Sequence, residues 1–374
     1  MLSLVDILNQ RTVDFSKLNT QELVHAAKYH RLVGAVYTEL NTLKNVPSEL
    51  LDHFKLLQQQ NVKQTLLQMR MLIKLDRLFN AHNISYLVLK GLLLSQRLYA
   101  DPARRQSMDL DVLIDPTQLL KVDQLLQEDG YIPLSHATLK ETEVYLKKFS
   151  LCHHDLTYLH PDSPYRIEVH FRLHDYNFNT PYSTLYENCC SSELMGHTFS
   201  VLSPVDEWIY LCTHGSRHGF ARLQWVKDIV EYQRSQLSFN SPEFYLAVNE
   251  KARRNGLNKH CELAVNIAQH YFPSYLNKKK EKFPMKKTCE KVIMGYYHAD
   301  AHGQSNRLPR VCLEVLQWRL TVRLVDKWRL LIYLPRSQFW LSWTKKKIPV
   351  HFYFLCYLLF LGKLLLFPFK RDNR

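Results

Sequence analysis

Two aspartates separated by one residue lie within an apolar stretch, SMDLDVLI, at residues 107–114. Side chains alternate along a strand, so Asp109 and Asp111 project from the same face. Two carboxylates on one face of a buried strand cost free energy unless a positive partner holds them. Mg²⁺ is a common partner, because it binds one or two carboxylates together with substrate phosphates. Taken alone, D-x-D also fits a strand edge that carries two solvated acids.

A second strand supplies further ligand atoms, which favours a metal site over a solvated strand edge. Residues 167–171, IEVHF, alternate between apolar and polar side chains, which places Glu168 and His170 on one face. Glu168 is therefore the candidate for a third carboxylate beside the two aspartates.

Candidate phosphate-binding residues precede the aspartates. Lys90 and Gly91 end the preceding strand and begin a helix. A glycine there permits close approach to the backbone, and helix N-termini attract phosphate. Arg104 and Arg105 lie in the loop before Asp109, where a guanidinium group can pair with phosphate oxygens. We expect Lys90 and Arg105 to bind phosphate groups of the substrate and to contribute little to the stability of the fold.

The elements that position these residues are predicted from periodicity and from turn residues. Helices are expected through residue 82, followed by a mixed α/β core and by helices after Pro204. The apolar positions assigned to one face of the long helix before residue 82 are Leu56, Leu57, Leu66, Leu67, Met71, Leu75 and Leu78. The expected core elements are strands at 84–90, 107–114, 152–160 and 165–173, the last two forming a hairpin, and helices at 92–99 and 116–129.

This order predicts an α+β fold in four parts. They are an N-terminal helical segment (1–82), an α/β core (83–203), a helical domain (204–306) and a basic, aromatic and apolar C-terminal region (307–374).

Taken together, the motifs resemble the uncharacterised nucleotidyltransferase family of bacteria, which belongs to the DNA polymerase β-like nucleotidyltransferase superfamily. The resemblance extends over residues 20–300. The family pattern K-G, L-Y-x-D-P and R-x-x-x-D-x-D is matched by Lys90, Gly91, Leu98, Tyr99, Asp101, Pro102, Arg105, Asp109 and Asp111. Glu168 and His170 match its [DE]-x-H strand, and residues 214–228 match its helical signature, H-G-x-x-H-x-x-x-R-L-x-W-x-x-D. Where the superfamily usually has Gly-Ser or Gly-Gly, this chain has Lys90-Gly91.

The resemblance implies a nucleotidyltransferase-type mixed-sheet core. It also implies transfer of a nucleoside monophosphate from a nucleoside triphosphate (NTP) to an acceptor hydroxyl, with release of pyrophosphate. Asp109, Asp111 and Glu168 would bind two Mg²⁺ ions, or Glu168 would instead deprotonate the acceptor. The residues expected to bind the nucleotide are Lys90, Gly91, Arg104, Arg105 and His170. The acceptor, whether RNA, protein or a small molecule, is not indicated by the sequence.

The helical signature is interpreted chiefly as structural. His214 and His218 lie four residues apart and share a helix face, but the segment lacks the glutamate of the zinc-binding H-E-x-x-H motif. Arg222 and Asp228 are expected to form an ion pair. His214 and Arg222 are the residues of this segment best suited to a direct role at the site.

Composition excludes several other classes. The ten glycines form neither G-x-G-x-x-G nor a P-loop, so dinucleotide-binding and P-loop proteins lose their main signal. None of the eight cysteines forms a C-x-x-C pair, which indicates a reduced, cytoplasmic chain without a zinc knuckle or a disulfide framework. The N-terminus has no basic segment of the secretory type.

The C-terminal region carries most of the positive charge. Residues 307–374 hold 14 Lys and Arg against three Asp and Glu, a net charge of +11 out of the chain's +14. Tryptophans and arginines alternate in its first half, and residues 348–369 are strongly apolar between basic flanks. This composition is typical of segments at a membrane interface, which predicts peripheral or re-entrant attachment to the cytoplasmic face of an anionic membrane. A terminal helix packed on the helical domain is the alternative.

Two other functional classes remain open. The basic, aromatic tail also suits RNA binding, in which arginines and tryptophans stack on bases, although the long apolar run does not serve that purpose. A non-catalytic binding protein that retains the fold, held at the membrane surface, is the third hypothesis.

Overall fold

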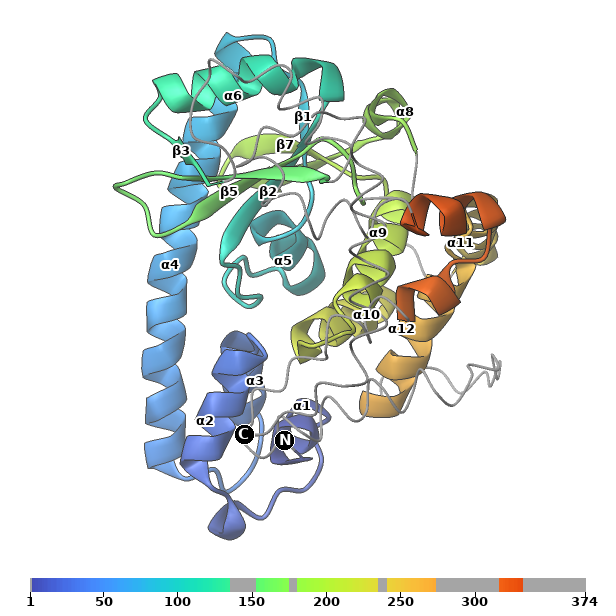
Figure 1. Ribbon diagram of the computed structural model, residues 1–374. Helices are drawn as coiled ribbons and strands as arrows, with labels where there is room; N and C mark the ends of the chain where they lie inside the picture. The colour runs from blue at the N-terminus through green and yellow to red at the C-terminus, as the bar shows by residue number, and fades with distance from the viewer. Residues whose placement is uncertain (1, 135–152, 175–179, 235–240, 274–315, 332–374) are drawn as a thin grey trace, which may run out of the picture.

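The computed structural model describes residues 2–134, 153–174, 180–234, 241–273 and 316–331. Its strands form one mixed sheet between helices, so the expected α+β class is confirmed (Figure 1). In sheet order the strands are β3 (Ile132–Pro133), β4 (Asp155–Leu159), β5 (Arg166–His170), β2 (Asp109–Ile114), β1 (Tyr86–Val88), β7 (His197–Val201) and β6 (Cys190–Leu194). The α-helices are α1 (Leu2–Leu8), α2 (Thr20–Tyr29), α3 (Val33–Leu40), α4 (Ser48–Ala81), α5 (Leu92–Tyr99), α6 (Leu119–Glu128), α8 (Tyr182–Glu187), α9 (Pro204–Arg217), α10 (Leu223–Arg234), α11 (Pro242–Asn255) and α12 (Asn258–Tyr271), with short 3-10 helices at Phe15–Lys17 and Pro116–Gln118.

The central strand β2 brings the two acidic motifs together. It pairs in parallel with β5, and the register sets Asp111 opposite Glu168 and Leu113 opposite His170. Its other neighbour, β1, is antiparallel to it. Because paired residues of parallel strands project from the same face, β2 and β5 present their polar side chains together.

The two faces of the sheet contribute to different cores. Leu110, Val112 and Ile114 of β2 pack in one hydrophobic cluster with the C-terminal half of α4 and with α6. Leu113 faces the other way and joins a cluster that contains the N-terminal helices and α9 to α12. Asp111 has the same parity as Leu113, so the acidic face of the sheet is turned toward this second cluster.

Local signals explain where the helices begin and end. α9 starts after Ser203, whose hydroxyl oxygen accepts from the backbone N–H of Asp206, and Pro204 occupies the first helical position. α11 starts in the same way after Ser241 and ends at Gly256 in the left-handed region.

The long helix α4 corrects one expectation. Leu56, Leu66 and Leu67, assigned to its buried face, are 57, 52 and 50% exposed. The buried stripe in the middle of this 34-residue helix is polar instead. Asn61 donates to the carbonyl of Ala103, and the Gln68 amide donates to the carbonyl of Ser107 at 2.9 Å. The central side chains of this helix thus hold the loop that leads into β2.

Most predicted core elements are confirmed, and several were missed. The helix at 92–99 and the hairpin of β4 and β5 form as expected. The sequence interpretation left out β3, α8 and the hairpin of β6 and β7. That hairpin lies at the sheet edge and is rich in serine, so it lacks the strong apolar alternation of an inner strand. The four domain boundaries remain predictions.

The apolar run at 348–369 lies outside the described residues. Among the helices that the structure describes, none combines the length and apolar character that a membrane crossing requires.

Candidate active site

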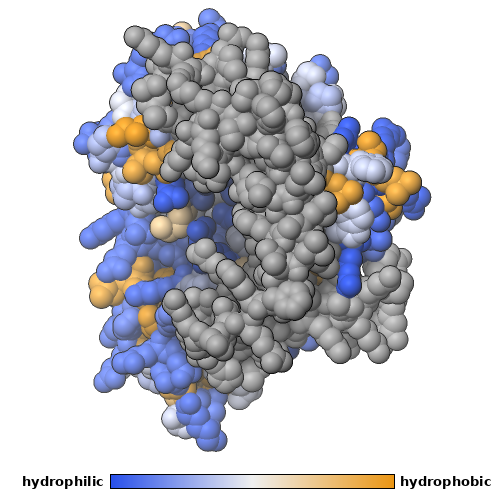
Figure 2. Space-filling view, in the orientation of Figure 1, coloured by the Kyte–Doolittle hydropathy of each residue, from blue (hydrophilic) through white to orange (hydrophobic). Residues whose placement is uncertain are grey.

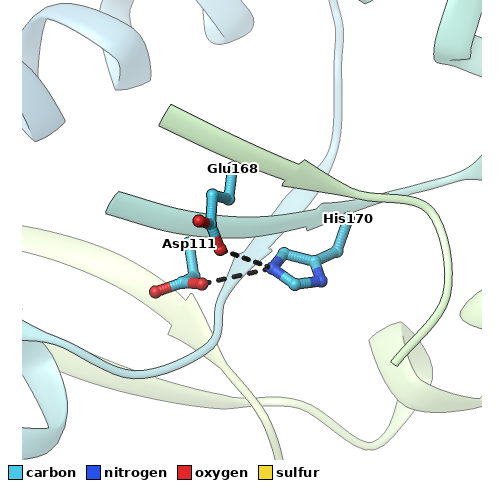
Figure 3. Close-up of side chains that lie close together, drawn as sticks. All are labelled: Asp111, Glu168 and His170. Carbon is cyan, nitrogen blue, oxygen red and sulfur yellow. Dashed lines mark hydrogen bonds and ion pairs between the residues drawn. The ribbon is translucent and has the colours of Figure 1, made fainter. Parts of the chain in front are cut away.

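Asp111 from β2 and Glu168 and His170 from β5 converge at one place on the acidic face of the sheet (Figure 3). One ligand atom of each residue lies within 4.8 Å of the others. The His170 Nε2 is 3.1 Å from the Asp111 Oδ1 and 3.9 Å from the Glu168 Oε2. These three residues form the site triad, which combines two carboxylates with one imidazole.

Lys90 completes the buried charges of the site. Its Nζ lies 3.0 Å from the Asp111 Oδ1, and the two side chains are 9 and 0% exposed. Burial opposes the charge on Lys90, but Asp111 together with the other acidic groups of the site outweighs burial, and the pKa of Lys90 lies above its ordinary value. Burial likewise opposes ionisation of Asp111, while Lys90 and the hydrogen bond with His170 hold its pKa below the usual range. The two groups therefore form an ion pair inside the protein.

Glu168 has the opposite electrostatic character. Burial raises its pKa, and the neighbouring carboxylates of Asp111 and Asp109 raise it further, to about 9. At neutral pH without a cation, Glu168 is therefore protonated. A divalent cation among these carboxylates would supply the charge that is missing.

The donor set fits a divalent metal ion. The Asp111 Oδ2 is a buried atom without a hydrogen-bond partner among the described residues, and such an atom costs free energy unless it is satisfied. Carboxylate oxygens suit Mg²⁺, and an added imidazole also suits Mn²⁺. The triad thus offers an unsatisfied carboxylate oxygen, a second carboxyl group and an imidazole nitrogen at one point.

Asp109 lies two residues before Asp111 on the same strand but outside the close-set triad. It is half-buried, and its charge acts on Glu168. The Ser107 hydroxyl donates to the Asp109 carbonyl at 2.8 Å and so fixes the start of β2. The role of Asp109 as a metal ligand remains a prediction.

Gly91 makes the turn from β1 into α5. Its φ is +72°, a region that favours glycine. A Cβ at this position would lie 3.4 Å from the Ser107 hydroxyl oxygen, so the turn also approaches the start of β2 closely. Lys90 is consequently held at the edge of the site by a turn that glycine favours.

The structure gives Arg104 and Arg105 carboxylate partners within the protein. Arg105 pairs with Asp228 at 3.0 Å, and both side chains are buried. Arg104 pairs with Glu39 at 3.4 Å. Their proposed contacts with phosphate remain predictions. The expected pair of Arg222 with Asp228 is wrong, because Asp228 bonds Arg105 and the Arg222 guanidinium donates to the carbonyl of Tyr29.

The α9 helix adds residues that the sequence interpretation missed or set aside. Tyr210 is buried, and its hydroxyl has no hydrogen-bond partner within the described ranges. Burial raises its pKa, Lys90 lowers it, and Asp111 and Glu168 raise it, so this hydroxyl lies within the field of the site. One turn later, burial and then Lys90 lower the pKa of His214, which is therefore neutral. The spacing of four residues before His214 was the available signal for Tyr210.

His214 also contacts the rings of His218 and Trp225, with centroids 4.8 and 5.4 Å away. In the part of the chain that the structure describes, the only grouping with metal-ligand geometry is the site triad. The two histidines of the helical signature therefore pack with Trp225 as an aromatic cluster.

Residues 16–273 match the family described as uncharacterised nucleotidyltransferase. The chain belongs to this family. Its match covers Lys90 after β1, the site triad on β2 and β5, and the helical signature on α9 and α10. The resemblance inferred from the motifs is thereby confirmed at the level of the family.

Among curated proteins, none matches the chain. Among solved structures, it is similar to an antigenic nucleotidyltransferase-like protein from Paracoccidioides brasiliensis. The sequences are 17% identical, the TM-score is 0.28, and the alignment covers 50% of this chain and 88% of the other. Membership of the family therefore rests on the sequence match and not on this weak structural likeness.

Proposed function

We propose that the protein is a metal-dependent nucleotidyltransferase that moves a nucleoside monophosphate from an NTP to an acceptor hydroxyl and releases pyrophosphate. The supporting observation is the convergence of Asp111, Glu168 and His170 beside the buried Lys90, in a chain of a nucleotidyltransferase family. We infer further that the fold is of the DNA polymerase β-like type, because the turn at Gly91 precedes a strand with D-x-D at its start.

Each residue of the site has a proposed role. Asp109, Asp111 and Glu168 would hold Mg²⁺, which when bound neutralises phosphate charge and polarises the phosphorus that is attacked. Lys90, in contact with Asp111, is placed to bind a phosphate oxygen when a cation takes over that carboxylate. The His170 imidazole orients Asp111 through its hydrogen bond. Glu168, which a bound cation would keep ionised, is the alternative candidate for accepting the acceptor's proton.

A label-transfer screen identifies the substrates. The purified full-length protein is incubated with each of the four NTPs labelled at the α-phosphate, with Mg²⁺, and with separate RNA, protein and small-molecule fractions. We expect one fraction to acquire label and Glu168→Gln to abolish the transfer. The control is Asp162→Asn, the same type of change at a carboxylate that is 91% exposed on the β4–β5 hairpin. Nucleotide binding without transfer to any fraction would favour a non-catalytic binding protein.

We also propose that the protein is cytoplasmic and attaches peripherally to an anionic membrane through residues 307–374. The supporting observation concerns residues 316–331, where Leu324, Val325 and Trp328 are 75, 51 and 66% exposed. Figure 2 shows apolar and hydrophilic residues side by side where Figure 1 places α11 and this segment. The Lys327 ammonium lies 5.3 Å from the centre of the Trp318 ring. Exposed tryptophan beside basic side chains suits a lipid headgroup region.

A further inference from the structure

Arg31 lies in a strained turn between α2 and α3. Its φ is +58°, a left-handed conformation that favours glycine over arginine. The turn is closed by the N–H of Leu32, which donates to the carbonyl of Ala27 at 2.8 Å. Keeping a residue in such a conformation costs free energy, which the rest of the structure must offset.

This turn is fastened to the same helix that fixes the start of β2. The His30 Nδ1 accepts from the backbone N–H of Leu223 at 3.2 Å, at the beginning of α10. Further along α10, the Gln224 amide donates to the carbonyl of Gln106 at 2.8 Å, and Asp228 holds Arg105. The turn at Arg31 and the loop before Asp109 are therefore both attached to α10. Figure 1 shows α2 and α3 on the side of α5 away from the sheet, with α10 alongside.

The Arg31 guanidinium differs from the other arginines in this neighbourhood. Arg104 and Arg105 have carboxylate partners, and Arg222 bonds a carbonyl. Arg31 is half-buried, yet it makes no side-chain hydrogen bond or ion pair with any residue in the described ranges.

The turn that carries Arg31 and the loop before Asp109 meet the start of α10 at the neighbouring residues Leu223 and Gln224, so Arg31 lies near charges of the active site and near two arginines. Burial lowers its pKa, the carboxylates of Asp109 and Asp111 raise it, and Arg222 and Arg105 lower it. A partly desolvated cation without a partner is costly. A guanidinium group in this setting matches the geometry and charge of a phosphate group.

We propose that Arg31 binds a phosphate group of the nucleotide beside Asp109, so that the N-terminal helices form one wall of the substrate site. This inference rests on the proposed function and extends it to a residue outside the family motifs. Asp109 and Asp111 would hold a cation from the sheet side, and Arg31 would pair with a phosphate group of the same nucleotide from the side of the N-terminal helices. The strained turn is then retained because it carries this contact.

The test compares Arg31→Gly with wild type. Glycine removes the guanidinium and suits the left-handed φ, so the variant separates ligand binding from stability. Asn83→Gly is the matched control, because Asn83 has a φ of +53° and lies in the turn between α4 and β1. Arg31→Gln is a second variant that keeps a polar side chain. Binding of Mg²⁺·pyrophosphate, a probe that needs no knowledge of the base, and of Mg²⁺·NTP is measured by calorimetry, and Tm by thermal unfolding.

We expect Arg31→Gly and Arg31→Gln to weaken binding of both probes by about 10- to 100-fold, the usual loss for one charge-assisted contact. The Tm of Arg31→Gly should not fall, and Asn83→Gly should bind like wild type. Unchanged binding, or a clear fall in the Tm of Arg31→Gly, would overturn the inference and make Arg31 a structural residue. If wild type binds neither probe, the proposed function fails, and this inference fails with it.

Discussion

Lys90 and Asp111 are each buried with the other as its charged partner. The cost of burying two charges is offset only while both are present, so removing one leaves an uncompensated charge inside the protein. Sequence alone predicted that Lys90 serves phosphate and contributes little to stability. Because Lys90 is buried as the partner of Asp111, we expect its replacement to weaken phosphate binding and also to lower the stability of the fold.

The first prediction concerns this pair. Asp111→Asn should lower the free energy of unfolding by about 3–5 kcal/mol, because it leaves Lys90 buried without its partner. Adding Lys90→Met should restore most of that loss without restoring nucleotide transfer. Urea unfolding measures the stability, with Glu250→Gln in an exposed ion pair as the control. A single variant as stable as wild type would show that the pair contributes nothing.

The second prediction uses the raised pKa of Glu168. Between the ordinary value of 4.5 and about 9, the folded protein binds more protons at this residue than the unfolded chain does. The Glu168 contribution therefore makes the metal-free protein less stable as pH rises through this range. Glu168→Gln keeps the shape of the protonated acid and should remove that dependence. Urea unfolding in EDTA from pH 5 to pH 9 measures the difference, which should grow with pH; a constant difference would contradict the assignment.

The common face of the acidic residues could be predicted from the sequence, whereas the partners of the arginines could not. Alternation was enough to place Asp109 with Asp111 on one strand and Glu168 with His170 on another, and the parallel pairing of β2 with β5 brings the two strands together. The bond between Arg105 and Asp228 joins residues 123 positions apart. Such a pair depends on how α10 packs against the loop before β2, which local patterns do not encode.

At the level of elements, the loop before β2 is held by three helices. The amides of Asn61 and Gln68 come from α4, Asp228 comes from α10, and Gly34 of α3 lies against the backbone of Arg104. These contacts set the position from which β2 begins. The N-terminal helices are therefore part of the framework of the site.

The third prediction tests this packing. A Cβ at Gly34 would lie 2.7 Å from the Arg104 carbonyl oxygen, closer than side chains tolerate. Gly34→Ala should shift α3 away from the loop, lower the Tm and weaken NTP binding together. The control is Gly196→Ala, where the added methyl group meets no atom within 4 Å but the positive φ strains the backbone. Gly196→Ala should lose some stability and keep NTP binding; equal losses of binding in both variants would contradict this role of α3.

Elements with strong apolar patterns were predictable, and those with mixed patterns were not. The helix at Leu92–Tyr99 and the β4–β5 hairpin follow from local sequence. The polar stripe of α4 was interpreted as apolar because its exposed leucines dominate the pattern. Periodicity shows where apolar residues recur along a helix, and it does not show which face of the helix a loop will cover.

At the scale of the whole molecule, the fourth prediction concerns the C-terminal region. The full-length protein should sediment with anionic liposomes at high salt, because each apolar side chain buried in lipid contributes about 1.5–3 kcal/mol and resists screening. Deleting residues 345–374 should release it and preserve NTP binding. In the full-length protein, Leu324→Ala combined with Trp328→Ala should weaken attachment relative to wild type. Recovery in the supernatant with salt-sensitive RNA binding would contradict the membrane proposal and favour RNA.

The central claim is that Asp109, Asp111 and Glu168 support metal-dependent nucleotidyl transfer. The most direct measurement is pyrophosphate release from NTP by the full-length protein together with the acceptor fraction that acquires label, with Mg²⁺, with Mn²⁺ and with EDTA. We predict metal-dependent release by wild type and by Asp162→Asn, and a loss of roughly 100-fold or more in Asp109→Asn and Glu168→Gln while both variants stay folded, the size expected when a group that stabilises the transition state is removed. Release that is unchanged by EDTA, or that survives in both acidic-site variants, would contradict the claim.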